Sequence, residues 1–210
     1  MVQSQIARIL FLLIAVPLAW GGLALQFHVL FPDASVRDAG HALVTFFSAL
    51  IIVGNLLMAL ALSVTLLLGR RFPSASLMTG LAVAVVLVAF THAVVPVKWW
   101  APHDEQWLAE MALHYVMPAV FALFWILFEP KGRLHWSAPF LWLAWPIVYV
   151  GWAIAGLTGF SSHALADVIV RDMPQLAYNA IWIATVFLLA GLFAAILDKI
   201  LGPLVQEENA

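Results

Sequence analysis

Residues 42–68 read ALVTFFSALIIVGNLLMALALSVTLLL, a stretch without a single ionisable side chain. An α-helix needs about 20 apolar residues to cross the ~30 Å hydrocarbon core of a bilayer, at ~1.5 Å per residue. The apolar residues here are continuous and lack the alternation that is typical of barrel strands, which favours a helix. The stretch therefore indicates a membrane-spanning helix and an all-α membrane protein.

Comparable apolar stretches recur along the chain, separated by short connections that contain proline, glycine and charged residues. With the stretch above they predict six spans, at residues 6–29, 41–68, 76–97, 107–128, 137–157 and 176–200. The first could instead be a signal peptide, because Arg8 precedes its apolar run, but the run is long and lacks a small-residue cleavage site. We expect one domain over residues 1–210, a polytopic six-transmembrane-helix bundle.

Composition excludes several classes of function. Of the 210 residues, 65% are hydrophobic and 10% are charged, against roughly 25% charged in soluble domains, so membrane lipid is the expected partner. The net charge of −2 argues against nucleic acid as a partner, since binding phosphates requires a basic surface. Without cysteine, thiolate metal sites and a cysteine nucleophile are excluded. The oligomeric state is left open.

The cationic residues predict the orientation. The amino-terminal end, the second and fourth connections and the carboxyl-terminal end share one side of the membrane and hold Arg8, Arg70, Arg71, Lys131, Arg133 and Lys199. The opposite side holds Arg37, Lys98 and Arg171. Because short cytoplasmic connections carry the excess of lysine and arginine, both termini are expected in the cytoplasm.

Polar side chains gather in the half of the bundle away from the cytoplasm. Glu110 and His114 stand four residues apart on one helical face, where the carboxylate could orient the imidazole as a general base. The alternative is that Glu110 simply extends to water. Asn55, near the bilayer centre, is expected to hydrogen-bond to another helix. The remaining members of this expected polar cluster are His41, Thr45, Ser48 and His92.

We expect the cluster to work without a cofactor. A metal site is the alternative. Imidazoles and carboxylates suit divalent metals such as zinc. The sequence has no HxxxH or HExxH spacing, so the ligands would have to come from separate helices. The candidates are His92 and His114 with one of His41, Asp104 or Glu110.

Several motifs in order resemble those of a group of bacterial six-helix membrane proteins, over about residues 46–202. The motifs include Phe46-Phe47-Ser48, Asn55-Leu56-Leu57, Leu113-His114-Tyr115-Val116, Trp125-Ile126-Leu127-Phe128 and Lys131-Gly132-Arg133-Leu134-His135-Trp136. This resemblance implies a multi-pass protein of the bacterial inner (cytoplasmic) membrane.

That group is in turn similar to the androgen-induced family of membrane hydrolases, which cleave fatty-acid esters of hydroxy fatty acids with an intramembrane threonine and histidine. The family histidine, which precedes a proline in the fourth helix, corresponds to His114. Local similarity places the threonine at Thr45, whereas alignment without gaps on Asn55-Leu56-Leu57 places it at Ile51. Phe124 stands where the relatives carry an acidic residue before the tryptophan.

Three hypotheses remain. In the first, the protein is a lipid-ester hydrolase with Thr45 or Ser48 as nucleophile, His114 as base and Glu110 as the residue that orients it. In the second, the protein is a structural, assembly or lipid-binding protein, and the polar cluster is a packed hydrogen-bond network. A small transporter is the least expected, because no charged residue falls at the bilayer midplane, where transport sites usually lie.

Overall fold

The chain folds into helices throughout its described part. The computed structural model describes residues 2–32, 39–48, 50–69, 73–94, 104–155 and 173–207, and every regular element in these ranges is helical. The all-α prediction is therefore confirmed. Five helical stretches are long and apolar enough to cross a membrane, as a multi-pass membrane protein requires: Gln5–Leu30, Ile51–Leu68, Ala75–Ala93, Glu105–Phe128 and Ala180–Gly202.

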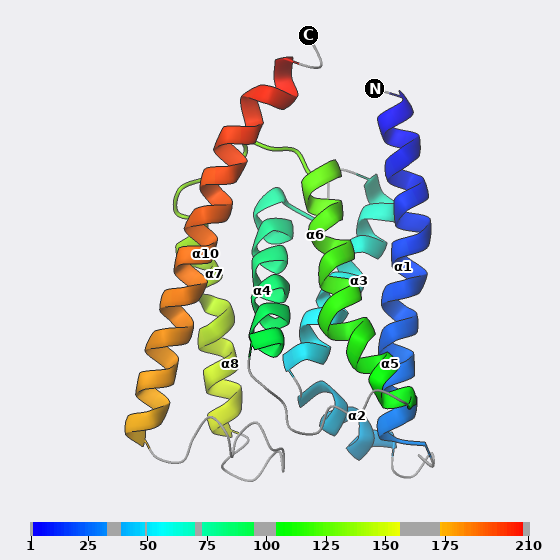
Figure 1. Cartoon of the computed structure of the whole chain (residues 1–210), viewed down its shortest axis with the longest axis vertical. Coiled ribbons are helices and arrows are strands. Elements are labelled where there is room, and N and C mark those ends of the chain that lie inside the picture. The colour runs from blue at the N-terminus through cyan, green and yellow to red at the C-terminus, as the bar shows by residue number, and fades with distance from the viewer. Residues whose placement is uncertain are drawn as a thin grey trace.

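Three of the expected spans are single helices. They are α1 (Val2–Leu30), α4 (Ala75–Val94) and α10 (Met173–Glu207). Figure 1 shows α1 and α10 on opposite sides of the bundle, with α4 between them. The start of α1 and the end of α10 lie at the same end of the molecule (Figure 1).

Each of the other three expected spans comprises more than one described helix, and in two of them Pro118 and Pro146 predict a kink. Proline explains the interruption of the fifth expected span, because Pro146 has no N–H to donate to the carbonyl of Trp142 four residues earlier, and the helix breaks at Leu143. Residue 49, between α2 and α3, lies outside the described residues. The pieces are α2 (Ala39–Ser48) with α3 (Leu50–Leu68), α5 (Glu105–Met111) with η2 (Ala112–Val116) and α6 (Met117–Phe128), and α7 (Ala138–Trp142) with α8 (Ala144–Ala155).

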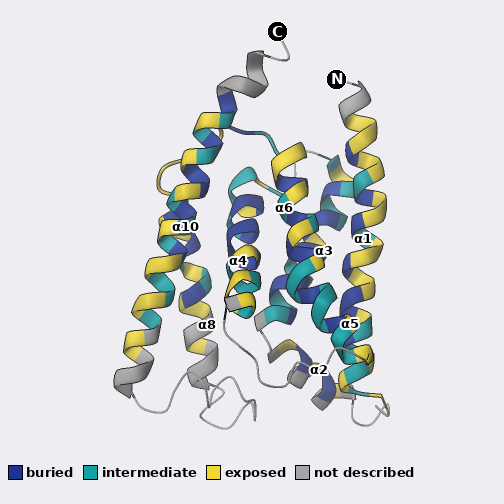
Figure 2. Ribbon diagram, viewed as in Figure 1, coloured by how far each residue is buried: buried dark blue, intermediate teal, exposed yellow. Residues whose placement is uncertain are grey.

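One hydrophobic core joins α1, α3, α4 and the α5–η2–α6 segment. On α1, the buried residues recur every three or four positions, at Leu12, Ala15, Ala19 and Leu23, which places them on one face of the helix. The opposite face carries exposed apolar side chains such as Ile14. Figure 2 shows this inside-outside pattern along the outer helices. Apolar residues on both faces are expected of a helix that packs on protein on one side and lipid on the other.

A second core lies between α4, α7 and α10 and is centred on Trp142. The Trp142 ring packs against two glycines: a Cβ added at Gly80 would lie 2.8 Å from the ring, and one at Gly191 would lie 3.3 Å from it. The ring nitrogen also donates to Ser76 Oγ at 3.2 Å. Trp142 therefore serves helix packing. It fixes α7 between α4 and α10.

The connection between α6 and α7 is held against α10 at the end of the molecule that carries the termini. The buried Asp198 on α10 accepts a hydrogen bond from Leu134 N at 3.0 Å through its carboxylate and one from Gly132 N at 2.9 Å through its backbone carbonyl. Gly132 has a positive φ of 79°, a conformation that favours glycine. Its Cα also approaches Gly202 so closely that a Cβ on Gly202 would lie 2.8 Å away. The loop and the helix are therefore in direct backbone contact.

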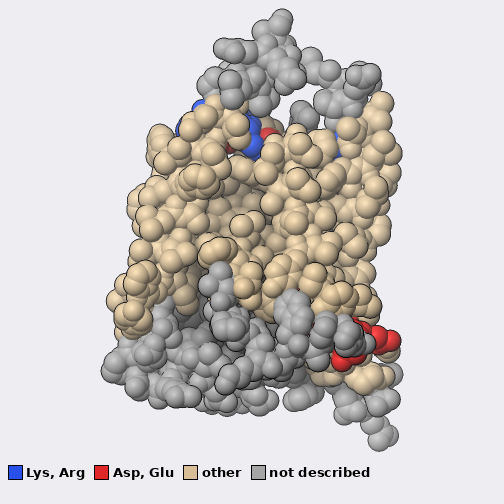
Figure 3. All heavy atoms as spheres, in the orientation of Figure 1, with Lys and Arg blue, Asp and Glu red and all other residues tan. Residues whose placement is uncertain are grey.

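Lys131, in the same loop, is buried. Its ammonium donates to the carbonyls of Trp125 and Glu129 and lies 3.8 Å from the centroid of the Trp125 ring. Burial lowers the pKa of Lys131 to about 8 from its ordinary 10.5, although the nearby carboxylates of Glu129 and Asp198 act in the opposite direction. On the face drawn in Figure 3, the described cationic side chains lie at this end together with a few carboxylate atoms, a cluster of carboxylates lies at the opposite end, and the described surface between them is uncharged.

Candidate functional site

The helix that carries His114 is distorted at that residue. In η2 the backbone follows the π register, with Met117 N–H donating to Ala112 O. The next donor in this register would be residue 118, which is a proline and has no N–H. Asn55 Nδ2 of α3 instead donates to the carbonyl of Leu113 at 3.1 Å, and also to Ile51 O at 2.9 Å. The predicted interhelical hydrogen bond of Asn55 is confirmed, and it supports the turn that carries His114.

Such π-helical turns occur often at functional sites, and here the turn presents His114 to an acid. His114 Nδ1 lies 2.9 Å from Glu110 Oε2 and 3.2 Å from the backbone carbonyl of the same residue. The other carboxylate oxygen of Glu110 accepts a hydrogen bond from Gln106 Nε2 at 2.6 Å. Gln106, Glu110 and His114 thus form a line along one helix, each four residues after the last.

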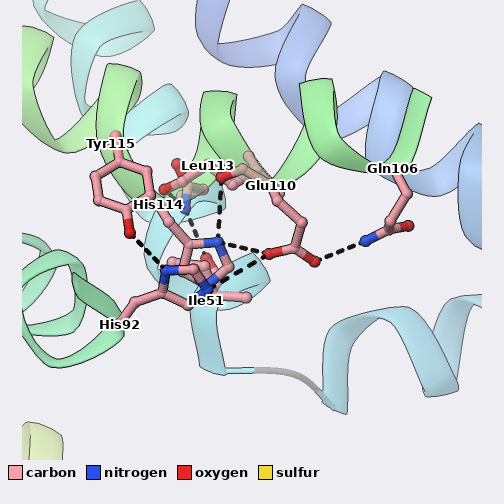
Figure 4. Close-up of polar contacts among 8 residues, drawn as sticks. Ile51, His92, Gln106, Glu110, Leu113, His114 and Tyr115 are labelled. Atoms are coloured by element: carbon pink, nitrogen blue, oxygen red, sulfur yellow. Dashed lines mark hydrogen bonds and ion pairs between the residues drawn. The ribbon is translucent and has the colours of Figure 1, made fainter. Parts of the chain in front are cut away.

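His92 of α4 completes the group from a second helix. Its ring stacks on that of His114, with the ring centroids 3.9 Å apart and the planes 25° from parallel. Its Nδ1 lies 3.0 Å from the hydroxyl of Tyr115, and its Nε2 lies 3.9 Å from Glu110 Oε2. Figure 4 shows the two imidazoles between the Tyr115 hydroxyl and the Glu110 carboxylate. We call His92, Glu110, His114 and Tyr115 the His–Glu site.

The His–Glu site is accessible but shielded. The side chains of His92, Glu110 and His114 are 15%, 20% and 13% exposed, so each is mostly but not fully buried. One carboxylate faces two imidazoles, so its single negative charge balances at most one protonated ring. The arrangement can exchange protons, accept hydrogen bonds and bind a cation through lone pairs.

The structure brings together three of the residues expected from the sequence: His92, Glu110 and His114. Glu110 does not simply extend to water, since it pairs with His114 and Gln106. Asp104, one of the alternative metal ligands, instead caps α5, where its carboxylate accepts a hydrogen bond from Trp107 N at 3.1 Å. Three further expected residues lie on α2, but their side chains are outside the described part of the structure: His41, Thr45 and Ser48.

Two members of the network were not predicted. Gln106 precedes Glu110 by four residues, and this spacing is a signal that could have identified it. Tyr115 follows His114 directly in the sequence, where an α-helix would turn it about 100° away from its neighbour, and nothing in the sequence links it to His92. Only the packing of α4 against η2 makes that contact.

Comparison of the chain with protein-family models, with curated proteins and with solved structures finds no match.

Proposed function

We propose that the protein crosses the bacterial inner membrane six times with both termini in the cytoplasm. The five long apolar helices and the shorter apolar helical stretch at Ala138–Val148, formed by α7 and the start of α8, support six crossings. An even number of crossings agrees with the two chain ends lying at the same end of the bundle (Figure 1). Arg8, Lys131, Arg133 and Lys199 belong to the connections and helix ends on that side, and the positive-inside rule assigns such a side to the cytoplasm.

In this orientation the His–Glu site lies in the outer half of the membrane, and its proposed activity is hydrolysis of a lipid ester. The observation that carries this proposal is the 2.9 Å contact between Glu110 Oε2 and His114 Nδ1. A carboxylate on Nδ1 holds the imidazole in the tautomer whose Nε2 has a free lone pair. Nε2 of His114 is then the general base, and Glu110 is the residue that positions it.

The reaction follows the chemistry of an activated hydroxyl. His114 Nε2 removes the proton from a hydroxyl, which the family resemblance assigns to Thr45, and the oxygen attacks the ester carbonyl. The alcohol leaves with the proton that His114 returns, and the acyl group stays on the threonine. Water, deprotonated by the same imidazole, then attacks the acyl carbonyl. The bond to the threonine oxygen breaks, the fatty acid is released, and His114 returns the proton to the threonine. A fatty-acid ester of a hydroxy fatty acid is the expected class of substrate, and the membrane is its source.

The test uses the purified full chain in lipid nanodiscs with a long-chain ester of a hydroxy fatty acid, and measures released fatty acid. His114→Ala should abolish turnover, because general bases contribute about 10²–10⁴-fold. Glu110→Gln should lower kcat, and Thr45→Ala should abolish turnover while Thr45→Ser retains some. His135→Ala is the matched control, since His135 is exposed on the α6–α7 loop. Release of fatty acid that is unchanged by His114→Ala would end the proposal.

A structural role is the second candidate, and one observation favours it. The polar groups of the site satisfy one another, since Gln106 pairs with Glu110, Glu110 with His114, and His92 with Tyr115. A network of this kind stabilises helix packing without any chemistry. This role predicts that His114→Ala lowers the thermal stability of the protein and that no ester is consumed by the wild type.

A further inference from the structure

The His–Glu site holds three metal-ligand side chains from two helices. His92 comes from α4, and Glu110 and His114 come from the consecutive elements α5 and η2 of the second helix. One candidate ligand atom from each residue lies within 4.8 Å of the other two. Among the described residues, this is the group in which three histidine or carboxylate side chains come within that distance of one another. We propose that these three residues bind one divalent transition-metal ion, of the zinc class.

The spacing of the ligand atoms supports this proposal. Two ligands about 2.1 Å from a tetrahedral zinc ion are about 3.4 Å apart. In the structure, Glu110 Oε2 lies 2.9 Å from His114 Nδ1 and 3.9 Å from His92 Nε2, on either side of that value. All three ligand atoms already lie within 4.8 Å of one another, and rotation of the imidazole rings out of their stacked arrangement would direct their lone pairs to one ion.

The surrounding hydrogen bonds orient the ligands as those of metal sites do. When His92 Nδ1–H donates to the Tyr115 hydroxyl, 3.0 Å away, the lone pair of Nε2 is directed toward Glu110, and this is the tautomer that a metal requires. Gln106 holds the Oε1 atom of Glu110 and leaves Oε2 on the side of the imidazoles. Figure 4 shows both supporting residues on the outside of the group. Two ligands thus have a partner that fixes their direction.

The number and type of the ligands indicate how the ion would be held. Two imidazoles and one carboxylate, with no thiolate, form the ligand set of a catalytic rather than a structural zinc site. A fourth coordination position is left for water or for a ligand from outside. The carboxylate balances one of the two positive charges of the ion, which favours a divalent cation over a neutral ligand in this shielded position.

This inference goes beyond the proposed hydrolase and does not require it. A metal ion on Nδ1 of His114 displaces the proton that donates to Glu110, so the metal-bound and the metal-free, base-active forms are alternative states of the same residues. Binding of the ion is measured on its own, whatever the activity of the protein. Turnover by the metal-free protein would support the hydrolase, and turnover that requires the ion would refute the base assignment but leave the metal site intact.

The experiment uses the full chain with a tag that contains no histidine, purified in detergent, stripped with a chelator and titrated with Zn²⁺ by calorimetry. One ion per chain is expected. His92→Ala, Glu110→Gln and His114→Ala should each raise the Kd by at least about 10-fold, and Tyr115→Phe should raise it by about 10-fold, as loss of a supporting group does at metal sites. The matched controls are His28→Ala and Tyr178→Phe, at exposed positions on α1 and α10.

Co²⁺ provides a readout that does not depend on the variants. In the wild type it should give the visible absorption of a four-coordinate site, and Zn²⁺ should remove that absorption at one equivalent. Binding that His92→Ala and Glu110→Gln leave unchanged would overturn the proposal. So would weak binding of several ions to the wild type and the controls alike, without the four-coordinate spectrum.

Discussion

Gly80 provides a sharp test of how α7 is fixed in the bundle. A Cβ added at this position would lie 2.8 Å from Cδ1 and Nε1 of Trp142, closer than real Cβ atoms come to their neighbours. The ring cannot move away freely, because its other edge packs near Gly191 and its nitrogen donates to Ser76. Gly80→Ala therefore has to displace the ring or the helix that carries it.

The expected magnitude follows from two opposing terms. Forcing an extra methyl group into a packed core costs about 1–3 kcal/mol. Replacing glycine by alanine within a helix stabilises it by about 0.5–1 kcal/mol. The sum is a net destabilisation of about 1 kcal/mol, and up to about 2 kcal/mol if the α7 segment cannot adjust. Gly21→Ala is the matched control, because a Cβ there meets nothing within 4 Å and only the helix term remains.

The assay is unfolding of the purified protein by SDS in mixed micelles, followed by circular dichroism. Gly80→Ala should unfold at a lower SDS fraction than the wild type, and Gly21→Ala at the same or a higher fraction. In a Trp142→Ala background the destabilisation by Gly80→Ala should disappear, since the clash has no partner, and only the stabilising helix term should remain. Equal stability of the Gly80→Ala and Gly21→Ala proteins would refute the packing of Trp142 between α4 and α10, and with it the position of the broken span.

Two further predictions concern buried polar groups. Burial lowers the pKa of Lys131 to about 8 in the folded protein, from 10.5. Between about pH 8 and 10.5 the unfolded chain therefore binds more protons than the folded one, and the free energy of unfolding should rise with pH across that range. Lys131→Met should flatten this slope in unfolding titrations, and an unchanged slope would contradict the assignment. Asn55→Leu leaves the carbonyl of Leu113 without its donor and should cost about 0.6–1.7 kcal/mol, the range for interhelical hydrogen bonds in membranes. Thr185→Val, whose hydroxyl bonds within its own helix, is the matched control and should cost less; an equal loss in both variants would argue against the interhelical bond.

The type of the helices and their approximate positions could be predicted from the sequence. In a bilayer, the backbone N–H and C=O groups of a long uncharged segment must find partners within the protein. A helix satisfies them within the segment itself and needs no partner strand. The interruptions were harder to predict. Pro118 and Pro146 each remove a backbone donor, and the sequence therefore predicts kinks. It does not say that the first is absorbed as a π turn held by Asn55, because that depends on which helix lies opposite.

In the His–Glu site, too, contacts within one helix could be predicted from the sequence, and contacts between helices could not. Glu110 and His114 are paired by their spacing on one helix, a local relation of about 5–6 Å between Cβ atoms that holds wherever the helix is placed. The approach of His92, the contact of Tyr115 with its ring, and the packing of Trp142 between two glycines join residues from different helices. Hydropathy is similar on all the faces of an apolar helix in lipid and does not specify which faces meet. Those contacts were decided by close packing of small and large side chains, and only the tertiary structure contains them.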